Sequence, residues 1–433
     1  MQRFTRLFLK VFVVFMLLSS MSKLSYSVQK RNNVQRIQQQ PVTNELVKIL
    51  ENNPKVKDLL VKSIESAKKI NPDIKSNPAQ TLEDWYTYID WSLKAMPWKA
   101  LRKEYFPGIF EGLDQGLDYF YFILDQPLDE LKGKGLYYNS LQYYEPIRSW
   151  VIKYVKQYGA HLDTRKSWNL DYYDAIYNDS RFGFKDHDWY EDPDNWRTFN
   201  DFFSRHLKSP SARPIADRDD DSVIVSPADS VPEGVWRIDM NANIVQKSGV
   251  KIKSSIYYYI PKLLGEKEDS PYRETFDGGY LTHTFLNVQD YHRFHFPVSG
   301  VVKELRIISQ DDAAGGITNW DPKLKKYVLD SRVPGWQSIE TRGLVILETK
   351  DYGIVALLPV GMSQVSSVKF EDNVKVGKYF SKGDPLGYFL FGGSDFIMLF
   401  QKKSGFKMTA PKEQNGTYKH ILMGEKYGTF NKK

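Results

Sequence analysis

The chain has 433 residues, of which 15% are aromatic, so it can bury a large core and is globular rather than disordered. It contains no cysteine, which excludes disulfide bonds, thiolate metal sites and a cysteine nucleophile. The formal net charge is +7, but part of this excess lies in the first 27 residues, so the charge is poor evidence for a nucleic-acid partner and we predict none.

The N-terminus has the pattern of a targeting segment. Basic residues precede the apolar run 11–18, and the small residues Ser25 and Ser27 offer a cleavage position for a signal peptidase. The run is shorter than the about 20 apolar residues of a membrane-spanning helix. We therefore predict a signal peptide over residues 1–27, with an uncleaved anchor or a buried helix as alternatives. The protein is expected to be exported or membrane-associated.

Residues 28–195 are predicted to form a mainly helical N-terminal domain. Apolar residues recur at helical spacing from Leu46 to Ile64, and further amphipathic stretches begin near Trp85, Tyr119 and Trp150. Aromatic stripes of this kind are more often packing faces than cofactor sites, so we expect them to lie in the core.

An exposed linker is predicted at residues 209–222, which contain two prolines and the charged run 217–221. Beyond the linker the apolar periodicity shortens to that of strands, and glycines separate the short apolar runs. The predicted strands are 223–225, 234–238, 301–308, 344–347 and 354–358. The sequence thus predicts an α+β fold, in which the helical domain precedes a compact antiparallel β core, of barrel or sandwich type, over residues 196–433.

The tripeptide Gly392-Gly393-Ser394 is a candidate self-cleavage site. A serine attacks the carbonyl before it only where the backbone bends sharply, and glycine reaches positive φ without steric cost. The serine also needs a base, and two histidines lie upstream in residues 290–297. Taken alone, the tripeptide is more often a turn between strands. Together with the histidines it indicates a protein that cuts its own backbone to make a cofactor.

The spacing of His292 and His295 also allows a metal-binding interpretation, because on a helix the two side chains would share a face. A metal needs more ligands, and the other histidines offer no comparable spacing, so no metal site is predicted. The residues alone leave open that either histidine is a hydrogen-bonded core residue.

Five segments, in this order, resemble the phosphatidylserine decarboxylase family of pyruvoyl enzymes. They are residues 198–205, 226–229, 290–297, 382–389 and 391–394. The resemblance implies a zymogen in which Asp229 orients the base His295 and Ser394 is the nucleophile. Ser394 would attack the carbonyl of Gly393, the residue after Gly392, and would itself become a covalent pyruvoyl cofactor. The cleaved α and β chains would then stay together as partners.

The implied activity is that of a carboxy-lyase which converts phosphatidylserine to phosphatidylethanolamine and CO₂ in phospholipid biosynthesis. The pyruvoyl carbonyl would withdraw the electrons released as CO₂ leaves. His292 would handle the proton at the substrate carbon. A membrane surface is the expected partner, and a homodimer is compatible with the resemblance.

Two alternatives remain open. Residues 285–288 and 361–362 are also similar to the pyruvoyl-type tryptophan decarboxylases, which favours a decarboxylase of free, including aromatic, amino acids. The other alternative rests on Asp395, where the family usually has a small hydroxyl residue. A carboxylate beside Ser394 would repel an alkoxide, or act as an extra base. Repulsion would favour an unprocessed pseudoenzyme that binds an amine or a lipid.

Overall fold

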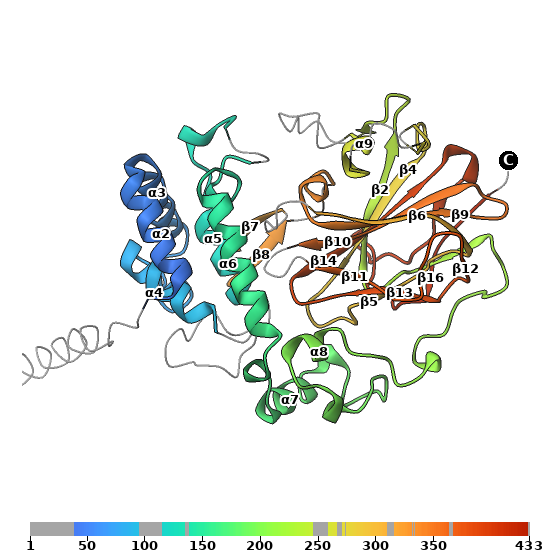
Figure 1. Cartoon of the computed structure of the whole chain (residues 1–433), viewed down its shortest axis with the longest axis horizontal. Coiled ribbons are helices and arrows are strands. Elements are labelled where there is room, and N and C mark those ends of the chain that lie inside the picture. Colours follow the sequence, from blue (N-terminus) through green and yellow to red (C-terminus); the bar gives the residue numbers. More distant parts are fainter. Residues whose placement is uncertain are drawn as a thin grey trace, which may run out of the picture.

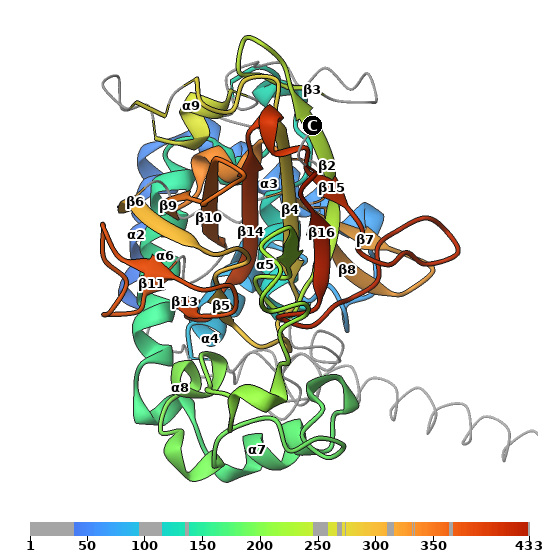
Figure 2. The ribbon, with the colours of Figure 1, turned by 90° about the vertical axis from the view of Figure 1, so that its right-hand side faces the viewer.

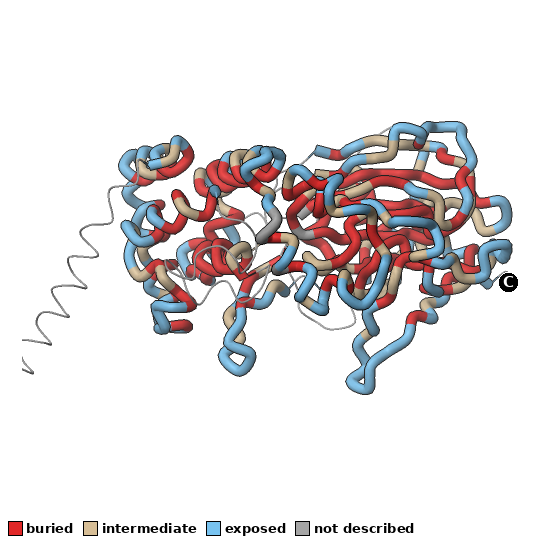
Figure 3. The backbone as a smooth tube through the Cα atoms, turned by 90° about the horizontal axis from the view of Figure 1, so that it is seen from below, coloured by how far each residue is buried: buried red, intermediate tan, exposed pale blue. Residues whose placement is uncertain are grey.

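The computed structural model describes residues 39–94, 115–134, 138–245, 259–265, 271–272, 274–309, 316–330, 332, 334–362 and 367–431. Helices gather at one end of the molecule and strands at the other (Figure 1). Buried residues run through both ends, and exposed residues are concentrated in the loops (Figure 3). The predicted leader, residues 1–27, lies outside the described residues. Among the helices of the described ranges, none combines the length and apolar character needed to cross a membrane.

In the described ranges, the helical end contains five longer helices. They are α2 (Pro41–Asn52), α3 (Pro54–Ile70), α4 (Leu82–Ser92), α5 (Gln115–Leu124) and α6 (Ile147–Leu162). The ring of Phe120 on α5 stacks on Tyr154 of α6 with centroids 4.3 Å apart. The indole of Trp150 on α6 donates a hydrogen bond to the carbonyl of Val42 on α2 at 2.8 Å. The predicted aromatic stripes are therefore packing faces of the core.

Two shorter helices, α7 (Leu170–Tyr177) and α8 (Phe199–Phe203), lead into the β core. A capping box starts α8, because Thr198 and Asp201 each accept a hydrogen bond from the backbone N–H of the other. Phe199 and Phe203 are buried against Phe391 of the β core, with centroids 5.0 and 5.2 Å away.

The β core is built on an eight-stranded antiparallel sheet with the order β12-β6-β9-β10-β14-β4-β2-β3. Its strands are β12 (Tyr379–Phe380), β6 (Gly300–Ile308), β9 (Arg342–Glu348), β10 (Ile354–Met362), β14 (Gly393–Phe400), β4 (Tyr280–Leu286), β2 (Val231–Ile238) and β3 (Ile244–Val245). Figure 2 shows β10, β14, β4 and β2 side by side in front of the helices. The sheet is open, with β12 and β3 at its edges, and does not close into a barrel. The predicted α+β class with an antiparallel β core is confirmed.

Both faces of this sheet are covered. Along β14, Phe396, Met398 and Phe400 belong to one buried cluster, whereas Ile397 and Leu399 belong to another. Successive residues of a strand point to opposite faces, so the alternation assigns each β14 residue to a face.

Two three-stranded sheets and a hairpin complete the β core. The sheets are β1 (Val223–Val225) with β16 (Lys426–Thr429) and β15 (Lys407–Met408), and β11 (Val368–Phe370) with β13 (Pro385–Phe389) and β5 (Arg293–His295). The hairpin joins β7 (Ile317–Asp321) and β8 (Lys326–Asp330), and α9 (Ile260–Leu263) is a short helix beside the large sheet. Gln115 of α5 hydrogen-bonds both the N–H and the carbonyl of Tyr327 on β8, at 2.8 and 2.9 Å, and so joins the helices to the β core.

Candidate active site

Ser394 is the second residue of β14, a central strand of the large sheet. Its register partners are Gly361 on β10 and Leu286 on β4. The side chain is fully buried, and its Oγ has no hydrogen-bond partner within the described part of the chain. A buried hydroxyl without a partner is costly, so its presence here needs a reason other than stability.

The backbone turns sharply just before Ser394. Gly392 has φ +149°, a conformation that residues with a Cβ rarely adopt. The preceding N–H, that of Phe391, donates to Oδ1 of Asn200 on α8 at 3.0 Å. The bend expected from the two glycines is therefore present, and the α8 helix fixes the segment that leads into it.

His292 is a neutral, buried imidazole. Its Nδ1 lies 2.9 Å from the carbonyl oxygen of Asp290 and so carries the proton, while Nε2 has no partner among the described residues. Burial, and secondarily the charge of Arg205, holds the pKa of His292 well below its usual range. The ring stacks on Phe203 at 3.7 Å, and Phe203 also contacts Phe391. Phe203 therefore lies in contact with both His292 and Phe391, the first residue of the segment 391–394.

His295 ends β5 and is engaged at both ring nitrogens. Nδ1 donates to the carbonyl of Gly383 at 2.9 Å, and Nε2 accepts from the hydroxyl of Tyr291 at 3.2 Å. Burial lowers the pKa of His295 to about 4, so this imidazole is also neutral at neutral pH. Because β5 is a strand, His292 and His295 do not share a helix face. In the described ranges no group of three or more His, Asp or Glu side chains is arranged to hold a metal ion.

Asp229 is held by an arginine that sequence analysis did not single out. Arg213 donates from Nε and a terminal nitrogen to the two carboxylate oxygens at 2.9 and 2.6 Å, and the N–H of Met423 donates at 2.8 Å. Arg213 is buried within the otherwise largely exposed stretch 209–222, and its guanidinium lies over Trp189 at 4.2 Å. Asp229 thus forms a salt bridge with Arg213 rather than a hydrogen bond to His295, although its negative charge favours protonation of that histidine.

A second acid–histidine pair lies beside the site. Nε2 of His420 is 2.9 Å from Oδ1 of Asp290, whose backbone carbonyl holds His292. Burial raises the pKa of Asp290. Burial also disfavours the protonated form of His420, but the hydrogen bond and charge of Asp290 outweigh it and raise its pKa. No motif or spacing in the sequence singles out His420, which lies 130 positions from its partner.

Asp395, the unusual neighbour of Ser394, points away from it. Its carboxylate lies 3.0 Å from Nδ1 of His283 and accepts a 2.9 Å hydrogen bond from Gln337. Strand alternation puts this network on the face of Ile397, opposite that of Ser394. The Asp395 carboxylate is therefore turned toward His283 and Gln337 and away from the side where an alkoxide at Ser394 would form.

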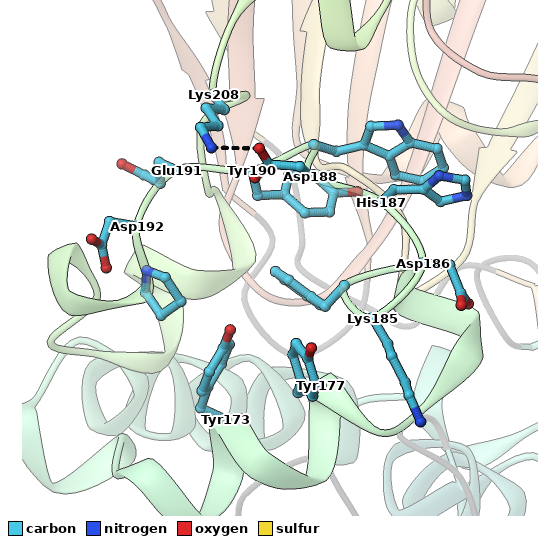
Figure 4. Close-up of a pocket in the computed structure, with 13 residues that line it drawn as sticks. Tyr173, Tyr177, Lys185, Asp186, His187, Asp188, Tyr190, Glu191, Asp192 and Lys208 are labelled. Carbon is cyan, nitrogen blue, oxygen red and sulfur yellow. Dashed lines mark hydrogen bonds and ion pairs between the residues drawn. The ribbon is translucent and has the colours of Figure 1, made fainter.

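Cavities lie near these residues, and one of about 510 Å³ is lined by Arg213 and Met423, which hold Asp229. Two more lie elsewhere around the site. One of about 270 Å³ lies between α5, the β7–β8 hairpin and the loop that follows Leu286, the register partner of Ser394. The other, of about 500 Å³, is lined by aromatic and charged side chains between α7 and residues 184–193 (Figure 4). Tyr190 lines the cavity of about 500 Å³ and contacts Tyr291, with ring centroids 6.3 Å apart. Both of these cavities are thus lined by neighbours of the candidate residues and not by Ser394, His292 or His295 themselves.

Comparisons with known proteins agree with the expected family. The profile described as phosphatidylserine decarboxylase matches residues 199–429, from α8 to the last strand. Phosphatidylserine decarboxylase proenzyme 2 of Oryza sativa subsp. japonica is 34% identical over 213 residues, which are 49% of this chain and 31% of the relative. The phosphatidylserine decarboxylase proenzyme of Clostridium novyi is 31% identical over 281 residues, 63% of this chain and 84% of the relative.

A third relative, decarboxylase iboD of Amanita muscaria, is 31% identical over 237 residues, 52% of this chain and 65% of the relative. The chain thus spans about a third of the length of the rice relative and most of the length of the bacterial one. Since the profile match takes in more than half of the chain and the bacterial relative is aligned over 84% of its length, the chain belongs to the phosphatidylserine decarboxylase family.

Proposed function

We propose that this protein is a self-processing, pyruvoyl-dependent decarboxylase that converts phosphatidylserine to phosphatidylethanolamine and CO₂. The observation that carries the proposal is the buried, unpartnered Oγ of Ser394, which directly follows a glycine pair with φ +149° at Gly392. In this family context, a hydroxyl at that bend is suited to attack the preceding carbonyl.

Self-cleavage uses groups of this chain and, in its last step, one water molecule. Oγ of Ser394 attacks the carbonyl carbon of Gly393, and its proton passes through His295 to the amide nitrogen of Ser394. The C–N bond breaks as the ester C–O bond forms, so the backbone is joined through the side chain. Elimination removes the Cα proton of residue 394 and breaks the Cβ–Oγ bond of the ester, so the upstream chain leaves as the Gly393 carboxylate. Water then hydrolyses the dehydroalanine left at position 394 to the pyruvoyl end, with loss of ammonia. The neutral state of His295 supports its role as the base, because only an unprotonated imidazole accepts a proton.

The buried, unpartnered Oγ of Ser394 fits the residue from which the pyruvoyl group of this family is made. Once formed, this group supplies the electron-accepting carbonyl that decarboxylation of an amine-bearing substrate requires. His292 handles the proton at the substrate carbon through Nε2, the ring nitrogen without a partner in the described residues, and Nε2 must take up a proton before it can deliver one. Phe203 and Phe391 keep bulk water away from this region, which strengthens each polar interaction inside it.

The names of the rice and Clostridium relatives support phosphatidylserine as the substrate. Neither name favours the alternative of a free amino acid as the substrate. The pattern of residues 1–27 supports export or attachment to a membrane surface, where a lipid substrate resides.

The experiment that tests this function is intact-mass analysis of the purified protein beside a Ser394→Ala variant. We expect a C-terminal fragment that begins at residue 394 with a ketone-reactive, blocked end, and we expect no such fragment in the variant. CO₂ release is then measured with phosphatidylserine vesicles and with free amino acids. A single uncut chain would overturn self-processing, and release from free amino acids alone would overturn the lipid substrate.

A further inference from the structure

Asp395 is held from two separate elements. On one side Oδ1 meets Nδ1 of His283, which lies on the neighbouring strand β4. On the other side Oδ2 accepts from the side-chain amide of Gln337, which lies on the 3₁₀ helix η8 (Trp336–Ile339). Asp395, His283 and Gln337 are all at most 1% exposed. We call these three residues the Asp395 network.

The partners of Asp395 are themselves fixed. Nε2 of His283 lies 3.1 Å from the carbonyl oxygen of Arg332, so both ring nitrogens face oxygen acceptors and both carry protons. The indole of Trp236 on β2 stacks on the imidazole at 5.0 Å. The Oε1 of Gln337 accepts from the N–H of Gly335 at 2.8 Å, which orients its NH₂ toward Asp395. The Asp395 network is therefore a buried ion pair in which Gln337 is a second, pre-oriented donor to the carboxylate.

Stability alone is a weak reason for such a network. Desolvation of two buried charges commonly cancels their attraction, and apolar residues of similar volume often stabilise a fold equally well. Burial opposes protonation of His283, and the charge of Asp395 outweighs it, so the pKa of His283 is raised. Glu233 is the other carboxylate whose charge acts on this histidine. What the network supplies is a fixed position for the Asp395 side chain.

That position matters because Asp395 is bonded to the reacting residue. In the uncut chain it lies one residue after Ser394, and after the proposed cleavage it is the second residue of the C-terminal chain. Chain ends fray unless they are tied down. The pairing of residue 394 with Gly361 and Leu286 holds the backbone, and the Asp395 side chain adds an anchor on the opposite face of the sheet.

We propose that Asp395, held by His283 and Gln337, is a positioning residue that fixes residue 394, first as the nucleophile and then as the end that carries the cofactor. The expected effects on the rates of cleavage and turnover rest on the proposed function. The fixing of the strand in the uncut chain does not depend on that function. The Asp395 network acts through β14 and does not touch the substrate.

The decisive variant is Asp395→Asn, which keeps the shape of the side chain and removes its charge. Its matched control is Asp90→Asn on α4, another buried carboxylate, which accepts from the backbone N–H of Gln40 at 2.9 Å and lies far from β14. We expect Asp395→Asn to slow the release of the residue-394 fragment by about 10- to 100-fold, since misplacement by about 1 Å can cost about 10²-fold in rate. In cleaved protein, kcat should fall while KM for phosphatidylserine vesicles stays the same.

His283→Gln should slow cleavage similarly, and the double variant should be little slower than either single variant, because both remove one shared contact. The positioning role is overturned if Asp395→Asn cleaves and turns over at the wild-type rate. The positioning role is also overturned if Asp90→Asn lowers Tm by the same amount as Asp395→Asn and slows cleavage equally. The slower cleavage would then result from general destabilisation.

A measurement on uncut protein separates this inference from the proposed function. In a Ser394→Ala background, amide hydrogen exchange at the start of β14 is compared with and without Asp395→Asn. We expect faster exchange confined to residues 394–397 and their partners on β4 and β10. Unchanged exchange there would refute the anchor, whether or not the wild-type chain cleaves. A wild-type chain that stays uncut, with faster exchange in the variant, would refute the proposed function and leave the anchor standing.

Discussion

The hydroxyl of Tyr291 donates to Nε2 of His295 at 3.2 Å, so in the uncut chain the nitrogen proposed to accept the proton of Ser394 is already occupied. Tyr291 is itself buried, and its ring lies beside that of Tyr190 in the wall of the cavity of about 500 Å³. Self-cleavage therefore requires that His295 exchange one hydroxyl for another.

Tyr291→Phe should remove this competition. The variant keeps the ring and its contact with Tyr190, and it leaves Nε2 of His295 without a partner. A hydrogen bond of this kind contributes about 0.5–1.5 kcal/mol, so self-cleavage should accelerate by about 2- to 10-fold. The measurement is the fraction of residue-394 fragment against time after refolding. Slower cleavage would show instead that the hydroxyl orients the imidazole.

The stability of the uncut protein should depend on pH through His295. Burial lowers its pKa from 6.5 to about 4, so between these values the unfolded chain binds a proton that the folded chain does not. The stabilisation is complete above pH 6.5 and is lost as pH falls toward 4. His292 acts in the same direction. Urea unfolding of Ser394→Ala should show this slope, and adding His295→Gln should reduce it. Equal slopes would contradict the buried neutral state.

Arg213→Met should strongly destabilise the fold. It leaves the buried carboxylate of Asp229 without its bidentate partner, and breaking a buried pair in this way costs about 3–5 kcal/mol in the free energy of unfolding. Adding Asp229→Leu should recover most of that loss, because no buried charge is then unpaired. The double variant should still fail to cleave if Asp229 acts in self-processing. Normal cleavage in the refolded double variant would exclude such a role.

Gly392→Ala should stop or greatly slow self-cleavage. At φ +149° a Cβ is strained, so the bend that presents the Gly393 carbonyl to Ser394 would relax. Gly416→Ala is the matched control, since Gly416 has φ +86° and an added Cβ would meet nothing within 4 Å. The control should lose about 1–2 kcal/mol of stability and cleave normally. Intact mass separates the two outcomes, and normal cleavage of Gly392→Ala would show that the bend is dispensable.

Features encoded locally were predictable from the sequence. The predicted strand 301–308 is β6, Gly300–Ile308, and the predicted strand 354–358 lies within β10, Ile354–Met362. The glycine pair predicted the bend before Ser394. These predictions succeed because propensity and periodicity act over a few residues.

Relationships that depend on tertiary pairing could not be predicted in this way. Arg213 lies in a stretch with the composition of an exposed linker, yet it is buried because Asp229 and Trp189 surround its guanidinium. The side-chain direction of Asp395 follows from the β14 register, and its partner His283 lies 112 positions away. The open sheet likewise depends on strand order, to which short strands and glycine turns give no guide.

Because β14 lies between β10 and β4, the proposed scission cuts the polypeptide at the start of a central strand and not in a surface loop. The C-terminal piece would keep hydrogen-bonded neighbours on both sides, and β16 would remain paired with β1. The two pieces would therefore not behave as separable subunits. Dilution would not dissociate them, and they would melt together in one transition, as a nicked but single folding unit.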